Sequence, residues 1–172
     1  FAFTVYEFVM LGRYPHMSPF TATTGDDKSA VSDALAQTGM TEFAERSMAT
    51  LSGGERQAVF VAAALAQGGK VLLMDEPTTY LDYPHQVDVL RLIRRLHREE
   101  GMTIVIVTHD VNQALAVCDH VVALKDGKHT FVGTPEELLA GDALESIFDT
   151  PFQRTVVDGQ RLPIVTPAGV LP

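Results

Sequence analysis

The chain has 172 residues, of which 46% are hydrophobic, and its 13 Lys and Arg against 22 Asp and Glu give a formal net charge of −9. This length is sufficient for one domain with its own hydrophobic core. The charge disfavours nucleic-acid binding, because clustered Lys and Arg are needed to neutralise the phosphate backbone. A membrane-spanning helix is not expected either, since the longest apolar run, Ala58 to Ala66, is far shorter than the roughly 20 residues required.

Two features of the chain favour a cytoplasmic location and a missing N-terminal segment. The single cysteine, Cys118, has no partner for a disulfide, and no basic-then-apolar leader opens the sequence. The chain begins at Phe1 and enters the apolar stretch FAFTVYEFVML at once. We therefore expect a segment upstream of Phe1 that this sequence does not include.

The first fifty residues are predicted to be mostly helical, with no strand. Thr4 and Glu7 have the spacing of a capping box, in which each side chain accepts a hydrogen bond from the other residue's backbone N–H. A short helix is therefore expected over 5–12, and a further helical turn over 41–46. Between them, four apolar residues at helical spacing predict a helix with one buried face: Ala30, Val31, Ala34 and Leu35.

From Leu51 onward the pattern is typical of an α/β protein. Two short apolar runs, VLLMD at 71–75 and TIVIV at 103–107, indicate strands that are buried on both faces. Because strands that alternate with helices form parallel sheets, we expect a parallel sheet with flanking helices. The helices are predicted over 55–67, 84–100 and 110–118, the second with an apolar stripe of Val87, Leu90, Ile93 and Leu96.

Beyond His120 the pattern becomes antiparallel. An Asp-Gly turn between two strand-like runs predicts a hairpin over 121–133. Thr134, Pro135 and Glu137 then have the spacing of a capped helix start. The tail over 154–165 contains a second Asp-Gly pair and is a candidate for one more hairpin.

Three short motifs carry residues suited to chemistry, namely LSGGERQ at 51–57, VLLMDEP at 71–77 and VTHD at 107–110. On one interpretation, Ser52 and the two glycines after it are an ordinary N-cap and turn. On the other, the serine hydroxyl and the helix N–H groups bind phosphate, and the glycines allow close approach. The residues alone leave both interpretations open.

Acidic residues follow the strand at 71–75, at an edge where α/β sheets bind ligands. Asp75 is suited to hold hydrated Mg²⁺, and Glu76 to orient or deprotonate a water for attack on a phosphoryl group. The alternative is that both carboxylates pair with nearby cations.

His109 follows the strand at 103–107, and we expect it at the same edge as the two carboxylates. A structural, hydrogen-bonded histidine is the alternative. The remaining histidines show no metal-ligand spacing and are predicted to be solvated or in loops: His16, His85, His97, His120 and His129.

In this order, LSGGERQ, VLLMDEPTTYLD and VTHD resemble the signature, Walker B, D-loop and switch-histidine motifs of ABC transporter ATP-binding subunits. FTVYEFVMLGRYPH is similar to the helical subdomain of importer ATPases for haem, iron-siderophore chelates or cobalamin. KDGKHTFVGTPEELL resembles the strand pair and helix that follow the switch histidine. The resemblance implies an α/β fold of P-loop NTPase type, with a permease-docking helical subdomain over 1–50 and the C-terminal part of the ATPase core over 51–172.

Roles for individual residues follow from the resemblance. Asp75 would hold Mg²⁺, Glu76 would be the catalytic base, and His109 would stabilise the γ-phosphate and the attacking water. Asp82 would belong to the D-loop, which communicates across a dimer. Ser52, Gly53 and Gly54 would contact the γ-phosphate of ATP held mainly by a second ATPase subunit in a head-to-tail dimer. The resemblance implies three further residues of the ATP-binding site: Leu51, Glu55 and Asp82.

The resemblance also implies partners and a location. A transmembrane permease would hold this subunit at the cytoplasmic face of the membrane as a peripheral protein, and a substrate-binding protein would act with it indirectly. The complete protein would hydrolyse ATP to drive uptake of an iron chelate, haem or cobalamin. No nucleic-acid partner is expected.

The sequence departs from the family because it contains no P-loop, G-x-x-x-x-G-K-[ST], whose backbone N–H groups and lysine hold the phosphates. We therefore expect these 172 residues alone to hydrolyse no ATP and to expose unpaired strand edges. A truncated, non-hydrolysing interaction module that docks on a permease or a partner ATPase is the alternative function. A DNA-repair ATPase is disfavoured by the net charge of −9 and by the lack of a long heptad stretch.

Overall fold

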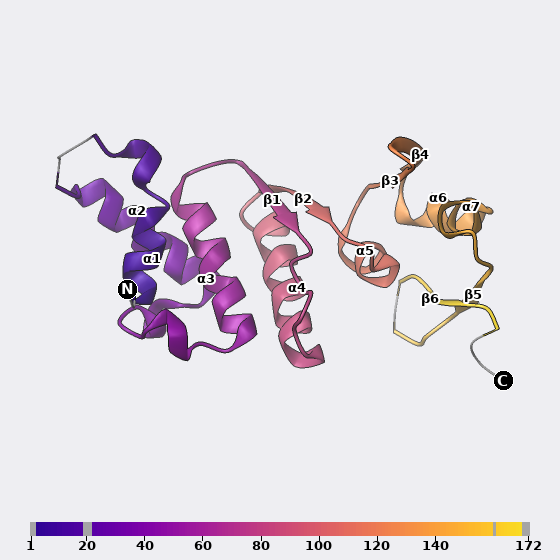
Figure 1. Cartoon of the computed structure of the whole chain (residues 1–172), viewed down its shortest axis with the longest axis horizontal. Coiled ribbons are helices and arrows are strands. Elements are labelled where there is room, and N and C mark those ends of the chain that lie inside the picture. Colours follow the sequence, from indigo (N-terminus) through magenta and orange to yellow (C-terminus); the bar gives the residue numbers. More distant parts are fainter. Residues whose placement is uncertain (1–2, 19–21, 160, 170–172) are drawn as a thin grey trace. The chain divides into compact units, whose positions relative to one another are not determined.

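The computed structural model describes residues 3–18, 22–159 and 161–169, in which helices and short strands alternate (Figure 1). The chain forms two units, residues 1–107 and residues 108–172. None of the helices in the described part of the chain has the length and apolar character of a membrane-spanning segment.

Helices α1 (Val5–Leu11), α2 (Gly25–Thr38) and α3 (Gly53–Ala66) build the first half of the first unit. The predicted capping box at α1 is confirmed, since the Glu7 N–H donates to Thr4 Oγ1 at 3.2 Å and the Thr4 N–H donates to Glu7 Oε2 at 2.8 Å. Single 3₁₀ turns connect these helices: Tyr14–His16, Thr41–Phe43 and Met48–Thr50. Over the described residues before Leu51, extended pairing is limited to one isolated bridge between Thr4 and Ser47.

The three helices share one hydrophobic core. Val31, Ala34 and Leu35 of α2 are buried as predicted, whereas Ala30 is half-buried at the edge of the same face. Burial of these apolar faces is the main term that stabilises the helices against solvent. The buried members of the core come from α1, α2, α3 and the turns between them: Val5, Val9, Val31, Ala34, Leu35, Met40, Leu51, Val59, Ala62 and Ala66.

The second half of the first unit contains a parallel pair of strands, β1 (Val71–Asp75) and β2 (Thr103–Val107), joined by α4 (Tyr83–Arg98). The parallel pairing is confirmed, but the prediction that both faces are buried is wrong. Leu72 and Met74 are buried, whereas Leu73 is 74% exposed. The reason is that α3 and α4 pack on one face of the pair, and alternate residues of a strand point to opposite faces.

The apolar stripe of α4 is displaced from its predicted position. Val87, predicted to be buried, is 42% exposed, and Leu90 is half-buried. A strict three-residue repeat drifts around a helix that has 3.6 residues per turn, so such a series cannot stay on one face. The buried residues follow the i, i+3, i+4, i+7 pattern instead: Val89, Leu92, Ile93 and Leu96.

The second unit begins with α5 (Val111–Val117) and the antiparallel pair β3 (Val121–Lys125) and β4 (Lys128–Gly133), which confirms the predicted hairpin. Its tight turn places Asp126 at φ 52° and Gly127 at φ 73°, the left-handed values that such a hairpin turn requires. Helix α6 (Pro135–Ala140) starts with the predicted capping box of Thr134 and Glu137.

Helix α7 (Ala143–Phe148) and a second antiparallel pair, β5 (Phe152–Thr155) with β6 (Ile164–Pro167), complete the second unit. The tail therefore does form a hairpin, with strands that extend beyond the predicted 154–165. Asn112 of α5 ties it to the helices, because its side chain donates to Val165 O at 2.9 Å and accepts from the Val165 N–H at 2.8 Å. The core of this unit consists of Leu115, Leu138, Leu144 and Val165.

Candidate ATP site

The start of α3 carries the predicted phosphate-binding residues. Ser52 is the N-cap of the helix, and it forms a capping box with Glu55: the Ser52 N–H donates to Glu55 Oε2 at 2.7 Å, and the Glu55 N–H donates to Ser52 Oγ at 3.3 Å. Leu51, immediately before it, is buried in the helical core. The segment is therefore fixed at both ends, one by packing and one by hydrogen bonds.

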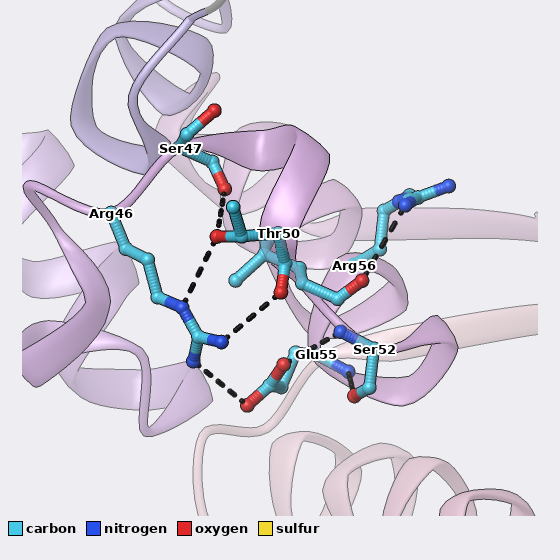
Figure 2. A network of polar contacts seen from close by, with 7 residues as sticks. Arg46, Ser47, Thr50, Ser52, Glu55 and Arg56 are labelled. Atoms are coloured by element: carbon cyan, nitrogen blue, oxygen red, sulfur yellow. Dashed lines mark hydrogen bonds and ion pairs between the residues drawn. The ribbon is translucent and has the colours of Figure 1, made fainter.

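Arg46 braces this segment, as Figure 2 shows. Its Nη1 lies 3.5 Å from Glu55 Oε1, its Nε donates to Thr50 Oγ1 at 3.2 Å, and its Nη2 donates to Thr50 O at 3.0 Å. The guanidinium also lies over the Phe43 ring, 5.4 Å from its centre. The Ser52 N–H lowers the pKa of Glu55 most, and the charges of Arg46 and His85 add to this effect. Sequence reasoning missed Arg46, because no local spacing links it to Glu55.

The two glycines of the signature segment have an intramolecular packing role. A Cβ at Gly53 would lie 2.8 Å from Leu81 Cδ2, and a Cβ at Gly54 would lie 2.5 Å from His85 Cδ2. Gly53 is itself exposed, whereas Gly54 is buried. The structure therefore brings the signature segment and the segment after Tyr80 into direct contact. This contact requires glycine at position 54, whereas a Cβ at position 53 would meet only the flexible end of the Leu81 side chain.

Asp82 is the N-cap of α4. Its Oδ1 accepts from the His85 N–H at 3.2 Å and is also bonded to His85 Nδ1. These hydrogen bonds to His85 lower the pKa of the Asp82 carboxyl. The prediction that His85 is merely solvated is wrong, because its ring is half-buried between this carboxylate and Gly54. The Asp-x-x-His spacing at a helix start was the one local feature that could have indicated the contact.

Asp75 and Glu76 lie at the C-terminal end of β1, as predicted. Asp75 is exposed and is the last residue of the strand. Glu76 has φ 46°, a left-handed value that costs a non-glycine residue roughly 1 kcal/mol or more, and strained residues of this kind cluster at active sites and ligand-binding sites. Its N–H donates to Val107 O at 2.9 Å, and its Oε2 accepts from Thr79 Oγ1 at 2.9 Å. Neighbouring residues thus fix both the backbone and the carboxylate of Glu76.

The residues present fit a magnesium ion that keeps most of its water. Within residues 3–18, 22–159 and 161–169, no cluster of three or more His, Cys, Asp or Glu side chains could enclose a metal. A single exposed carboxylate such as Asp75 is the kind of ligand that Mg²⁺ takes when waters and phosphate oxygens complete its octahedron.

His109 belongs to the second unit and is exposed in the segment between β2 and α5. Its neighbours are ordered by local hydrogen bonds, since the Asp110 N–H donates to Thr108 Oγ1 and Asp110 Oδ1 accepts from the Gln113 N–H, both at 3.1 Å. The strand that leads to it, β2, ends with Val107 paired to Asp75. Its place beside the two carboxylates remains a prediction.

Comparison with known proteins identifies the family. The sequence model of the ABC transporter family matches residues 3–79. A solved structure described as an inward-facing conformation of a metal-chelate type ABC transporter is 31% identical, with a TM-score of 0.88, and the match covers 97% of this chain and 67% of that one. The chain belongs to the ABC transporter ATP-binding family. The predicted α/β fold of P-loop NTPase type is thereby confirmed.

The matches to other members of this ABC family cover a smaller share of each relative's length. The iron(3+)-hydroxamate import ATP-binding protein FhuC of Bacillus subtilis (strain 168) is 47% identical over 145 residues, which are 84% of this chain and 54% of that protein. A dimeric, post-hydrolysis structure of the ATP-binding cassette MJ0796 with ADP and Pi is 30% identical, with a TM-score of 0.61, over 77% of this chain and 56% of that one. The chain thus spans little more than half the length of the curated relatives it matches.

Proposed function

We propose that this chain supplies the signature, Walker B, D-loop and switch-histidine parts of the ATP-hydrolysing subunit of an ABC importer. The observation that carries the proposal is the contact of the signature segment with the D-loop, through Gly53 on Leu81 and Gly54 on His85. The signature segment and the D-loop lie about 30 positions apart in the sequence, and both belong to the first unit. Through these contacts the two motifs form one continuous surface.

The signature segment is proposed to bind the γ-phosphate of an ATP molecule held mainly by a second ATPase subunit. The first N–H groups of a helix have no partner within the helix, and the helix dipole favours an anion there. The capping box occupies the N–H groups of Ser52 and Glu55, while Gly53 is exposed at the first position of α3. Leu51 and Glu55 would hold this segment in place, and Asp82 would contact the partner subunit.

Glu76 is proposed to be the general base. Its Oε2 accepts from the Thr79 hydroxyl, and the carboxylate held in this way would orient a water and accept its proton. Asp75 would hold Mg²⁺, which when bound neutralises charge on the phosphates. His109 is proposed to donate a hydrogen bond to the γ-phosphate or the attacking water.

The proposed partners are a second ATPase subunit, a transmembrane permease and, indirectly, a substrate-binding protein. Residues 1–50 would dock on the permease, and residues 51–172 would belong to the ATPase core at the cytoplasmic face of the membrane. An iron chelate is the proposed cargo, with haem and cobalamin as alternatives. The names of the FhuC relative and of the metal-chelate type transporter support this choice.

ATP-dependent self-association of the full-length gene product tests the proposal. Gly53→Asp would place a negative charge beside the γ-phosphate and abolish dimers that form with MgATP, as measured by analytical ultracentrifugation. Gly53→Ala makes the same contact with Leu81 without the charge, and Gly25→Asp adds the same charge at the first position of α2, where a Cβ meets nothing within 4 Å. Both controls should dimerise. Equal dimerisation of all variants would contradict the proposal.

A further inference from the structure

His85 occupies the third position of α4, where a helix start that follows the capping-box pattern has Glu or Gln. Those side chains accept a hydrogen bond from the N-cap backbone. His85 does something different, since its ring Nδ1 is bonded to the side chain of the N-cap residue, Asp82. The side chain at this position therefore bonds the Asp82 carboxylate and not the backbone N–H of the N-cap residue.

The same ring packs on the signature helix. A Cβ at Gly54 would lie 2.5 Å from His85 Cδ2 and 2.9 Å from both Cβ and Cγ of His85, so the imidazole lies directly against the Gly54 backbone. Only a residue without a Cβ at position 54 allows the two segments to approach this closely.

Hydrogen bonds connect the rest of the D-loop to the same turn of α4. Gln86 Nε2 donates to Leu81 O at 3.0 Å, and the Leu81 N–H donates to Thr78 O at 3.2 Å. The Gln86 N–H donates to Asp82 O at 2.9 Å. The D-loop is thus attached to the first turn of α4, and this turn meets the signature segment through the His85 ring.

We propose that His85 is a positioning residue that holds the D-loop and the signature segment in one fixed arrangement, so that Asp82 and Gly53 meet the partner subunit together. This inference rests on the proposed function. Because the ring contacts Gly54 and the imidazole nitrogen holds Asp82, one side chain sets the distance between two surfaces that must both fit a second subunit.

Three substitutions separate the two contacts of His85. His85→Asn keeps a nitrogen donor at the position of Nδ1 but loses the outer part of the ring. His85→Phe keeps a flat ring over Gly54 and loses the donor, and His85→Ala loses both. His97→Asn and His97→Ala, at the other end of α4, are matched controls, since the His97 ring bonds Met102 O at 2.8 Å far along the sequence from the D-loop.

Hydrogen exchange of the Leu81 and His85 amides and steady-state ATP hydrolysis are measured on the full-length gene product. We expect His85→Ala and His85→Phe to speed exchange at these two amides about tenfold and to lower kcat about tenfold, with the KM for ATP within about twofold. His85→Asn should restore both quantities to within about threefold of wild type, and the His97 variants should change neither.

The two readouts separate this inference from the proposed function. If the wild-type protein hydrolyses no ATP, the proposed function fails, and the exchange rates still decide the role of His85. Unchanged exchange at Leu81 in both His85→Ala and His85→Phe overturns the inference. Failure of His85→Asn to restore the wild-type exchange rates of the Leu81 and His85 amides overturns it too. A loss of amide protection throughout a folded His85→Phe protein does the same. Each of these outcomes would mean that His85 acts only through packing.

Discussion

Arg13 Nε lies 3.0 Å from Asp27 Oδ1, and both side chains are almost fully buried, at 12% and 6% exposed. The guanidinium also donates to Ala66 O at 2.7 Å, so one side chain joins the end of α1, the start of α2 and the end of α3. The pKa of Asp27 is lowered from 3.8 to about 2, first by its hydrogen bonds from Thr24 and then by Arg13. The helical part of the first unit therefore depends on the charge of one carboxylate.

Asp27→Asn should lower the stability of the chain in a pH-dependent manner. A carboxylate whose pKa is lowered on folding contributes stability that is fully present above its unfolded pKa and is lost as the pH falls through the folded pKa. The difference in urea midpoint between wild type and Asp27→Asn should be constant above pH 4 and shrink between pH 3.8 and about 2. Asp88→Asn is the control, because its pair with Arg91 is exposed. A difference in urea midpoint that stays the same at every pH would contradict the view that the charge of Asp27 causes it.

Arg46→Gln should loosen the start of α3. Losing the guanidinium removes the ion pair with Glu55 and two hydrogen bonds to Thr50. Since the pair is partly exposed, we expect a small change in overall stability, below about 1 kcal/mol. Amide exchange over 52–55 should be faster in this variant and unchanged in Arg91→Gln, whose ion pair lies on the surface of α4. Equal protection of these amides in all three proteins would refute a bracing role.

The uncovered face of the β1–β2 pair should make the 172-residue chain self-associate. Leu73 and Val105 are 74% and 48% exposed, and unpaired strand edges and apolar patches promote association. The double variant Leu73→Thr with Val105→Thr places polar, β-branched residues that favour strands at both positions, and it should remain monomeric to a higher concentration in light scattering. Val156→Thr changes an 83% exposed valine elsewhere and should have no effect. A monomeric wild type would be inconsistent with this interpretation.

The 172 residues alone should show no measurable ATP hydrolysis. They contain no G-x-x-x-x-G-K-[ST] segment, and the phosphate-cradling N–H groups and lysine provide most of the stabilisation in phosphoryl transfer. A coupled-enzyme assay of phosphate release with MgATP tests this. Robust turnover by the isolated chain would show that its own residues replace the P-loop.

Local sequence patterns were sufficient for much of the fold. The capping boxes at Thr4 and Thr134 and the Asp-Gly turn at Asp126 each depend on residues within a few positions of one another, and all three formed as predicted. Burial of β1 was predicted wrongly for a different reason. A run such as VLLMD indicates an apolar strand, but which of its two faces is buried depends on the helices that pack against the strand.

The candidate site divides in the same way. The placement of Ser52 at a helix start and of Asp75 at a strand end could be predicted, because each depends on its own element. The bracing of Glu55 by Arg46 and the contact of His85 with Gly54 could not, since they join residues from different turns and helices. Such contacts depend on tertiary packing, which no spacing within one motif encodes.

Glu76→Gln in the full-length gene product is the most direct test of the central claim, that this chain carries the general base of an ABC ATPase. The amide keeps the shape of the side chain and the contact with Thr79 but cannot accept a proton. We predict that MgATP hydrolysis falls at least about 100-fold while ATP binding is retained. Glu99→Gln, an exposed change at the end of α4, should hydrolyse at the wild-type rate. Hydrolysis by Glu76→Gln within about twofold of wild type would contradict the account.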